Sequence, residues 1–443
     1  MQSVLRFTSS MKFLKWCFES IAHVVALQKI VQALTGLVTA SLVTIYLTPD
    51  EQGYFFTMGS LLSSYILLDL GLSNLLIQFS ARSFTGLSWH KQEIVDASDG
   101  QKKSNFLDLV SWTLRWYAFA GLATFLLIPI GYIYFHFAKS TVDVAWQLPW
   151  IAIVSSVALS MPAIGLLSIL EGAEKIRVTY TLRIAHYLLG AIVAWMLLIQ
   201  GHGLFAQSMA PLAIAVVVIY WLKKHYGTLL KNHLFNKSNF NWKLHVWPQQ
   251  KRVTVSWFSN YLFLHVPVPV VFYFSGARIA GKMGLSMVVA NVVGAIAMSW
   301  VTAATPRITK LIAQGDVDEG RALFERSLLT AVFLLLIGGL AASGLTVLIH
   351  GYSLSERILN PSQLILLFFV FALFHGINAL IVYFRAFKKE PLALPSLIAT
   401  SSIVVIGCFV VPLYSVNGAI CLMAIVYSLF SFYAWRLFKG FTS

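Results

Sequence analysis

Charged residues are scarce in this chain: only 11% of its 443 residues are Asp, Glu, Lys or Arg, whereas 58% are hydrophobic. A globular protein in water needs a larger charged share on its surface, so this composition excludes a water-soluble fold. Instead of charge, the sequence has repeated apolar runs of about 20 residues, the length that an α-helix needs to cross a bilayer. The sequence therefore predicts an all-α polytopic membrane protein.

Motifs for covalent chemistry are also missing. The three cysteines, Cys17, Cys408 and Cys421, have no metal-binding or redox spacing. The chain has no Walker A loop and no HExxH or GxSxG motif. We therefore expect no enzymatic activity, no metal site and no cofactor.

Acidic residues are few, and the net charge is +15. In a membrane protein such an excess is typical of Lys and Arg in cytoplasmic loops, so we do not expect nucleic acid as a partner. The aromatic residues between the basic residues of segment 223–252 favour contact with membrane lipids.

The apolar runs predict twelve membrane-spanning helices, at residues 21–47, 54–80, 112–137, 144–170, 182–200, 204–222, 253–274, 283–305, 327–349, 361–384, 392–414 and 418–437. Polar segments separate them, including a turn at 48–53, a hydrophilic loop at 81–111 and a charged loop at 306–326. Segment 223–252 has seven basic residues and no acid. We interpret it as a cytoplasmic basic linker between an N-terminal six-helix lobe, residues 1–222, and a C-terminal six-helix lobe, residues 253–443.

The distribution of Lys and Arg predicts the orientation. Most of the 32 basic residues fall in one alternating set of segments, which includes the N-terminal tail, the linker and the C-terminal end. The opposite set has only four, Lys139, Arg278, Lys282 and Arg357, and Lys29 lies within the first helix. By the positive-inside rule, both termini and the linker are expected in the cytoplasm.

The two halves contain an internal repeat. Residues 46–62 (YLTPDEQGYFFTMGSLL) and 273–289 (YFSGARIAGKMGLSMVV) are each a helix end, a small polar turn with glycine, and a new helix rich in small residues. Duplicated halves with six helices each predict two bundles related by a pseudo-two-fold axis. Such an architecture favours transport by alternating access.

Four segments carry a resemblance to a known family: LTPDEQGYF (47–55), LLDLGLSNLLIQF (67–79), LEGAEKIRVTYTLRI (170–184) and ATPRITKLIAQGDVDEGRALFERSL (304–328). With them the chain resembles the polysaccharide transporter and O-antigen flippase family of the multidrug/oligosaccharidyl-lipid/polysaccharide exporter superfamily. The resemblance implies a MATE-like fold and translocation of a polyprenyl-diphosphate-linked oligosaccharide across a bacterial cytoplasmic membrane. It also implies a cationic lumen between the lobes and, as a further partner, polysaccharide polymerase machinery.

Lys29 is the leading candidate for substrate binding, because an ammonium at membrane depth normally faces a cavity or a partner. With Gln28, Gln32, Thr35, Gly36 and Thr39 it forms a polar stripe at helical spacing. A lumen-facing Lys29 would attract a diphosphate, with Gln32 beside it. Alternatively, Lys29 reaches the nearby membrane interface and serves as an anchor.

Three further residues of the first half are candidates. Arg183 offers the bidentate geometry that suits phosphate, although an interface anchor is the alternative. His186 lies one turn further along the same helix. Asp69 is the one acid well inside an apolar run, and it either couples transport to a cation or makes a structural pair.

The second half has a weaker set. His375 and Arg385 share a helix face with Asn378, and His265 lies in another helix beside Pro267 and Pro269. The two prolines remove backbone donors and predict a helix break, which is either a hinge near the substrate or a simple kink. Each histidine alone is equally well explained as a hydrogen-bonded core residue.

Two other functions remain open. A cation-coupled multidrug or small-molecule antiporter could use the same scaffold, but it would need acids in its cavity, and the interior has one acid against several basic or histidine groups. A membrane scaffold or accessory subunit of glycan synthesis would need no polar lumen. The sequence thus favours the flippase.

Overall fold

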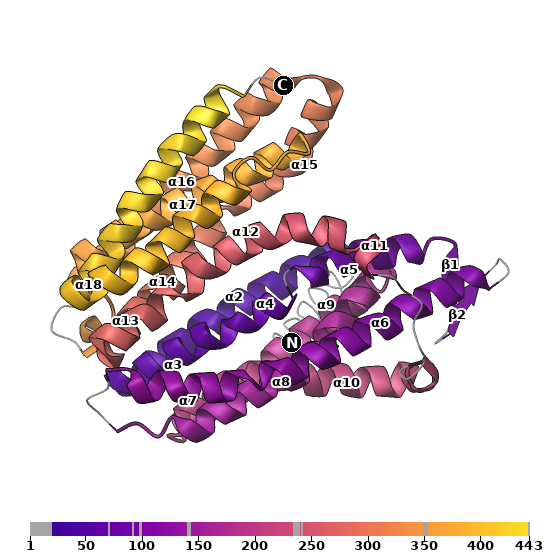
Figure 1. Ribbon diagram of the computed structural model, residues 1–443, viewed down its shortest axis with the longest axis horizontal. Coiled ribbons are helices and arrows are strands. Elements are labelled where there is room, and N and C mark those ends of the chain that lie inside the picture. The colour runs from indigo at the N-terminus through magenta and orange to yellow at the C-terminus, as the bar shows by residue number, and fades with distance from the viewer. Residues whose placement is uncertain are drawn as a thin grey trace, which may run out of the picture. The chain divides into compact units, whose positions relative to one another are not determined.

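The computed structural model describes residues 20–69, 71–90, 93–96, 100–139, 143–233, 240, 242–348 and 353–441. Within these residues eleven helical segments are long and apolar enough to cross a membrane, and a two-stranded sheet is the only sheet (Figure 1). The expected all-α polytopic architecture is confirmed. Part of the predicted linker, residues 234–239 and 241, lies outside the described residues.

The described chain forms two compact units. The described residues of the first unit fall within 20–46, 65–132 and 145–251, and those of the second within 47–64, 133–144 and 252–441. Two short segments that precede the linker, 47–64 and 133–144, thus make their contacts mainly within the second unit.

The first unit is built around the helix α8. This helix is the most buried of the membrane spans, and it packs against α5, α6 and α10, while α2 packs against α9. Its helices are α2 (Ile21–Tyr46), α4 (Ile66–Asp69), α5 (Leu72–Ser83), α6 (Gln101–Thr124), α7 (Leu127–Phe137, which continues into the second unit), α8 (Gln147–Gly172), α9 (Ile176–Ile199), α10 (Ala206–His233) and α11 (Trp242–His245), with the 3₁₀ turns η1 (Ser63–Tyr65) and η2 (Gly203–Phe205).

The predicted hydrophilic loop at 81–111 contains regular structure. Strands β1 (Leu87–His90) and β2 (Glu93–Asp96) form an antiparallel hairpin, and α6 begins at Gln101, well before the predicted start at 112. The Trp89 indole N–H donates to the carbonyl oxygen of Ala173 over 2.7 Å, and the Lys175 ammonium lies 4.9 Å from its ring centre. These contacts fix the hairpin against the α8–α9 turn.

The second unit is a helical bundle in which α17 packs between α16 and α18, and α14 packs against α3, α16 and α17. Its elements are α3 (Pro49–Leu62), α12 (Trp247–His265, which begins in the first unit), α13 (Pro267–Ser275), α14 (Ala277–Ala297), α15 (Ser299–Gln314), α16 (Val317–Leu348), η3 (Ser353–Arg357), α17 (Pro361–Ala386) and α18 (Ala393–Lys439).

The 47-residue α18 is two membrane spans. Ser415 interrupts it with φ 54° and ψ −143°. A methyl group at Gly407 would lie 3.9 Å from Cδ2 of Leu422, although fifteen residues of straight helix would separate them by about 22 Å. The helix therefore folds back at Ser415, which agrees with the predicted spans 392–414 and 418–437.

The segment 306–326 is helical, not the charged loop that its composition suggests. Helix α15 continues to Gln314, and α16 starts at Val317. Gly315, at φ 95°, ends α15 in the left-handed conformation, and its N–H donates to the carbonyl oxygen of Ile312. Only this glycine and Asp316 separate the two helices.

The predicted turn at 48–53 is the first turn of helix α3. The Thr48 hydroxyl accepts from the Glu51 N–H over 3.2 Å, and the Glu51 carboxylate accepts from the Thr48 N–H over 2.8 Å. With Pro49 at the first helical position, this capping box starts the helix five residues before the predicted start at 54.

The two repeated segments pack against each other within the second unit. Pro49 begins α3 and Ala277 begins α14, so Gly53 and Gly281 are each the fifth residue of their helix. A methyl group at Gly53 would overlap the carbonyl oxygen of Ala277, and one at Gly281 would lie 3.3 Å from the carbonyl oxygen of Pro49. These reciprocal contacts are what a pseudo-two-fold axis through the crossing would produce.

Candidate functional site

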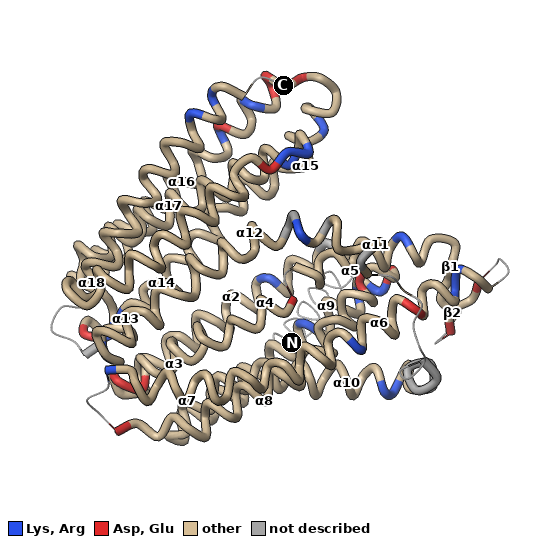
Figure 2. The backbone as a smooth tube through the Cα atoms, in the orientation of Figure 1, with Lys and Arg blue, Asp and Glu red and all other residues tan. Residues whose placement is uncertain are grey.

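Most charged residues lie near the ends of the helices, with long uncharged stretches between them (Figure 2). The polar stripe of α2 is an exception, and its side chains face two ways. Gln28 and Thr35 are buried, whereas Lys29, Gln32 and Gly36 are exposed. The stripe therefore runs along the edge of α2.

Helix α9 contacts this stripe at Thr39, and a second hydrogen bond lies within α2. The Trp195 indole N–H donates to the Thr39 hydroxyl over 2.9 Å, and the Gln28 amide donates to the Gln32 carbonyl oxygen over 3.0 Å. No described carboxylate lies within ion-pair distance of the Lys29 ammonium. Lys29 is thus an open cation on an ordered helix face.

Arg183 is charge-compensated. Its Nη2 lies 2.8 Å from Oε2 of Glu171, and the Tyr180 hydroxyl donates to Oε1 of the same carboxylate over 3.0 Å. The guanidinium carbon also lies 4.8 Å from the centre of the Tyr180 ring. The tight turn between α8 and α9, with Glu174 at φ 65°, brings Glu171 back toward the face of α9 that carries Tyr180 and Arg183.

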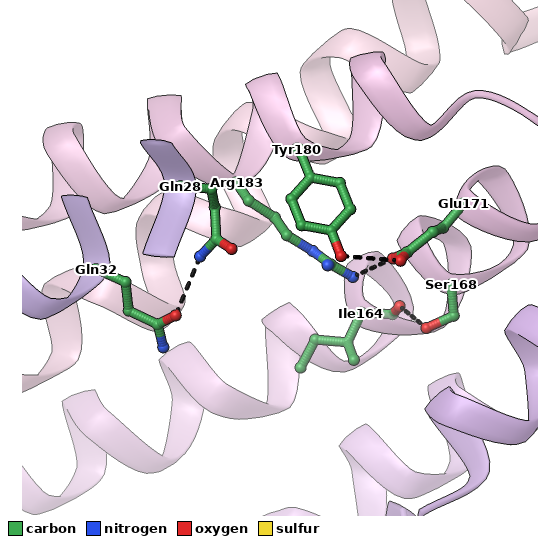
Figure 3. A network of polar contacts seen from close by, with 7 residues as sticks. All are labelled: Gln28, Gln32, Ile164, Ser168, Glu171, Tyr180 and Arg183. Atoms are coloured by element: carbon green, nitrogen blue, oxygen red, sulfur yellow. Dashed lines mark hydrogen bonds and ion pairs between the residues drawn. The ribbon is translucent and has the colours of Figure 1, made fainter. Parts of the chain in front are cut away.

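The Arg183 group and the α2 stripe belong to one polar surface. Figure 3 shows the Gln28 side chain beside that of Arg183, with Gln32 on one side and Tyr180 and Glu171 on the other. The side-chain amide oxygen of Gln28, Oε1, is buried and has no hydrogen-bond partner among the described residues. The exposed edge therefore offers a cation at Lys29 and a carboxamide at Gln32, with the buried Gln28 and the neutral Arg183–Glu171 pair beside them.

His186 lies one turn beyond Arg183 on α9 and is 5% exposed. Its ring packs against that of Tyr187, with centres 4.3 Å apart, and its Nδ1 is buried with no described hydrogen-bond partner. His186 is therefore a buried residue of α9 and is not part of the exposed edge.

Asp69 lies where the second span is interrupted. Helix α4 ends at Asp69 and α5 begins at Leu72, with Gly71 between them at φ 74°. The carboxylate accepts from the Ser73 N–H over 3.2 Å, from the Ser73 hydroxyl over 3.0 Å and from the Tyr117 hydroxyl. Asp69 thus caps α5 and ties it to α6, and the described structure has no ion pair between Asp69 and Lys29.

In the second unit, His265 and the two prolines lie at one helix junction. His265 is the last residue of α12, and Pro267 is the first residue of α13. The His265 ring stacks on that of Tyr261, with centres 5.8 Å apart. The Tyr134 hydroxyl donates to the carbonyl oxygen of Pro269 over 2.6 Å, so this backbone group has a partner at the junction.

The other candidates of the second unit do not form one polar surface. The His375 ring packs so closely on α14 that a methyl group at Gly294 would overlap it. Asn378 donates to the carbonyl oxygen of Phe374 in its own helix over 3.1 Å. Arg385, at the end of α17, forms a 3.0 Å ion pair with Glu390. Each of the three polar side chains thus has a separate environment.

Comparisons with known proteins give a clear result for the fold. No family model and no curated protein matches the sequence. The structure of the lipid II flippase MurJ in an inward closed conformation matches with a TM-score of 0.64 and 12% identity, covering 94% of this chain and 88% of that chain. An inward-facing MATE family multidrug resistance transporter of the MOP superfamily matches with a TM-score of 0.65 and 14% identity, covering 92% and 94%.

A third match is the MATE multidrug transporter DinF-BH in complex with R6G, with a TM-score of 0.57, 14% identity and coverage of 96% and 95%. The chain has the MATE/MurJ fold. This confirms the expected MATE-like architecture and, with the eleven spans, a multi-pass membrane protein. At these identities the fold alone is shown, and the resemblance to the O-antigen flippase family stays a prediction.

Within this MATE/MurJ-like fold, sequence reasoning missed two kinds of residue. Glu171 and Tyr180 were visible in the charged break 171–183, and their proximity to Arg183 along the chain was the available signal. Tyr117, which binds Asp69, lies 48 residues away in an apolar helix, so no sequence signal pointed to it. Among the described residues, no group of three His, Cys, Asp or Glu side chains could hold a metal ion.

Proposed function

We propose that this protein is a flippase that translocates a polyprenyl-diphosphate-linked oligosaccharide, such as an O-antigen repeat unit, across the bacterial cytoplasmic membrane by alternating access. The fold supports a transporter, because the similar structures are those of a lipid II flippase and of multidrug transporters. The substrate class rests on the resemblance of the four sequence segments and on the polar surface of α2 and α9.

The observation that carries the proposal is the state of the charged groups in the first unit. The acid of the polar surface, Glu171, is occupied by Arg183 and Tyr180, and Asp69, between α4 and α5, accepts three hydrogen bonds. Lys29 has no described acidic partner. A surface whose acid is neutralised and whose one open charge is positive suits an anionic substrate.

In this proposal the residues of the surface have distinct roles. Lys29 attracts the diphosphate as a mobile point charge. The exposed carboxamide of Gln32 exchanges hydrogen bonds with sugar hydroxyls, and the buried Gln28 holds it in place. Arg183, held by Glu171, keeps the surface rigid and contributes little net charge. The polyprenyl chain stays in the lipid, since transferring it to a polar surface would forfeit about 0.8 kcal/mol per buried CH₂ group.

The alternative, a cation-coupled antiporter for drugs or small molecules, has the support of the MATE transporters among the similar structures. An organic cation would need an available carboxylate, and Asp69 is the candidate. The three donors around Asp69 favour a structural role for its carboxylate, so we place the antiporter second.

The flippase proposal is tested with Lys29→Ala in a strain that lacks the native gene. We expect surface glycan to fall to the level of the empty-vector strain with unchanged protein abundance, and Lys29→Arg to restore part of it because the charge is kept. Lys223→Ala, an exposed lysine of α10 in the same unit, is the matched control and should keep normal glycan. Normal glycan in Lys29→Ala would remove Lys29 from the mechanism.

A further inference from the structure

The second unit contains a cavity of about 690 Å³ at the first turns of α14. Its walls also include η3 and the N-terminal turn of α17. The lining combines two basic side chains, Arg278 and Lys282, with the carboxamides of Asn360 and Gln363. It is separate from the α2–α9 surface, which belongs to the first unit.

Basic residues are concentrated at this cavity, although the side of the membrane on which it is expected to lie has few of them. The sequence predicts that this side of the membrane has only Lys139, Arg278, Lys282 and Arg357. Arg278 and Lys282 are one helical turn apart on α14 and both line the cavity. Arg357 is the last residue of η3. The guanidinium of Arg278 is close enough to that of Arg357 to lower the pKa of Arg357. Three of the four cations therefore gather at one place.

Three acids, Glu356, Glu51 and Asp50, lie near these cations and act to raise the pKa of Arg357, so the basic side chain of the cavity lining that is left without a described ion pair is that of Lys282. The Glu51 carboxylate is engaged with the Thr48 N–H in the α3 cap. Asp50 lies 3.8 Å from Arg278, and this ion pair is the one that the described residues form around the cavity. Glu356 lines the cavity but is exposed to solvent. Lys282 makes no ion pair with a described residue.

Arg357 is the least satisfied of the three cations. Its Nη1 is buried and has no hydrogen-bond partner among the described residues. Burial of the guanidinium, and then the charge of Arg278, lower the pKa of Arg357 from its usual value, and the nearby acids Glu356, Glu51 and Asp50 offset only part of this. A buried guanidinium donor without an acceptor is unfavourable, so a ligand that supplies anionic oxygens would stabilise it.

The walls of the cavity are held in place before any ligand binds. The Gln52 amide nitrogen donates to the carbonyl oxygen of Arg357 over 2.9 Å and to that of Gly281 over 3.0 Å. The Ser286 hydroxyl accepts from the Leu359 N–H over 3.1 Å. Both contacts fix η3 and the segment after it against α14, which positions Arg357 beside Arg278.

We propose that this cavity binds a diphosphate group, with Arg278 and Lys282, which line it, as its main contacts and with Arg357 adjoining it. The inference rests on the proposed function, since the diphosphate would be that of the carrier lipid after translocation to this side. The same phosphate chemistry could come from an ordinary anionic lipid headgroup, and the experiment separates the two sources.

The test is isothermal titration of the full-length protein in a non-ionic detergent with inorganic pyrophosphate. We expect saturable binding that Lys282→Gln weakens by at least about tenfold, because a charge-assisted hydrogen bond is lost. Lys139→Gln, which removes the one basic residue of this side that does not line or adjoin the cavity, should leave the affinity unchanged. Thermal unfolding of both variants establishes that each is folded.

The source of the phosphate is tested with dioctanoyl phosphatidylglycerol, a phosphodiester. We expect it to bind at least about tenfold more weakly than pyrophosphate, since it offers fewer anionic oxygens for two cations. Equal binding would overturn the carrier assignment in favour of a lipid headgroup. Pyrophosphate binding that is absent, or equal in Lys282→Gln and wild type, would overturn the site. Translocation measured separately in the wild type distinguishes this failure from failure of the proposed function.

Discussion

Arg183 and Lys29 are both basic residues of membrane-spanning helices, and the protein accommodates them differently. A charge at membrane depth costs about 2.5–3.5 kcal/mol on insertion scales, so each needs a partner or a polar environment. Arg183 has Glu171 and Tyr180. Lys29 is exposed on the edge of α2 and has no described acidic partner. We therefore assign Arg183 a structural role and Lys29 a role in substrate binding.

Substitutions of Asp69 distinguish the flippase from the antiporter, because only the antiporter needs its negative charge. If its role is structural, Asp69→Asn keeps the acceptor for Tyr117 and the Ser73 N–H, and we expect near-normal stability and transport. Asp69→Ala removes every acceptor and should destabilise the protein by about 1–3 kcal/mol for each donor left buried without one. Thermal unfolding and glycan assembly of both variants provide the measurement.

The contrary outcome for Asp69 is equally specific. If Asp69→Asn were as stable as the wild type but abolished transport or drug resistance, the carboxylate charge itself would be required. A coupling role for Asp69 would then replace the structural one.

At this scale the sequence indicated residues but not their partners. Lys29 and Asp69 were evident because a charge in an apolar run is rare. The Arg183–Glu171 pair depends on the left-handed Glu174 in the turn, and a positive φ at a non-glycine residue has no sequence signal. The neutralised Arg183 is therefore a finding of the structure.

Among the helices, the crossing of α3 and α14 depends on the absence of side chains at the contact. Gly53 approaches the backbone of Ala277, and Gly281 approaches the backbone of Gly53. A methyl group at Gly284 would also come close to the Phe56 side chain. Backbone atoms cannot move aside as a flexible side chain can, so the crossing tolerates little added volume.

We therefore expect Gly53→Ala to destabilise the protein by about 1–3 kcal/mol or more, as overpacking in a close contact does. The matched control is Gly36→Ala in α2, where no atom lies within 4 Å of the added methyl group. Removing a helical glycine there should stabilise the helix by up to about 1 kcal/mol. Thermal unfolding in detergent compares the two, and equal stability of Gly53→Ala and Gly36→Ala would contradict the contact.

The positions of the spans could be predicted from the sequence because the length of an apolar run is set by bilayer thickness. The exact starts could not, since capping at Thr48 and the early start of α6 depend on local hydrogen bonds. The hairpin at 87–96 was missed because each strand has only four residues. The repeat was visible, but repetition alone does not show that its copies are in contact.

For the whole molecule, the orientation remains a prediction of the charge distribution. We expect a cysteine at Lys139 to react with a membrane-impermeant maleimide in intact cells, and a cysteine at Lys310 to react only after permeabilisation. Both lysines are exposed, and the three native cysteines are replaced by serine beforehand. The reverse labelling pattern would place the linker and the termini outside the cytoplasm.

The flippase function itself can be measured as translocation in proteoliposomes that contain only this protein and a polyprenyl-diphosphate-linked oligosaccharide. An impermeant oxidant added outside modifies the sugars of the outer leaflet. Our account predicts that the protected inner-leaflet fraction becomes accessible with wild-type protein and stays protected with Lys29→Ala. An equal protected fraction in liposomes with and without wild-type protein would contradict the flippase function.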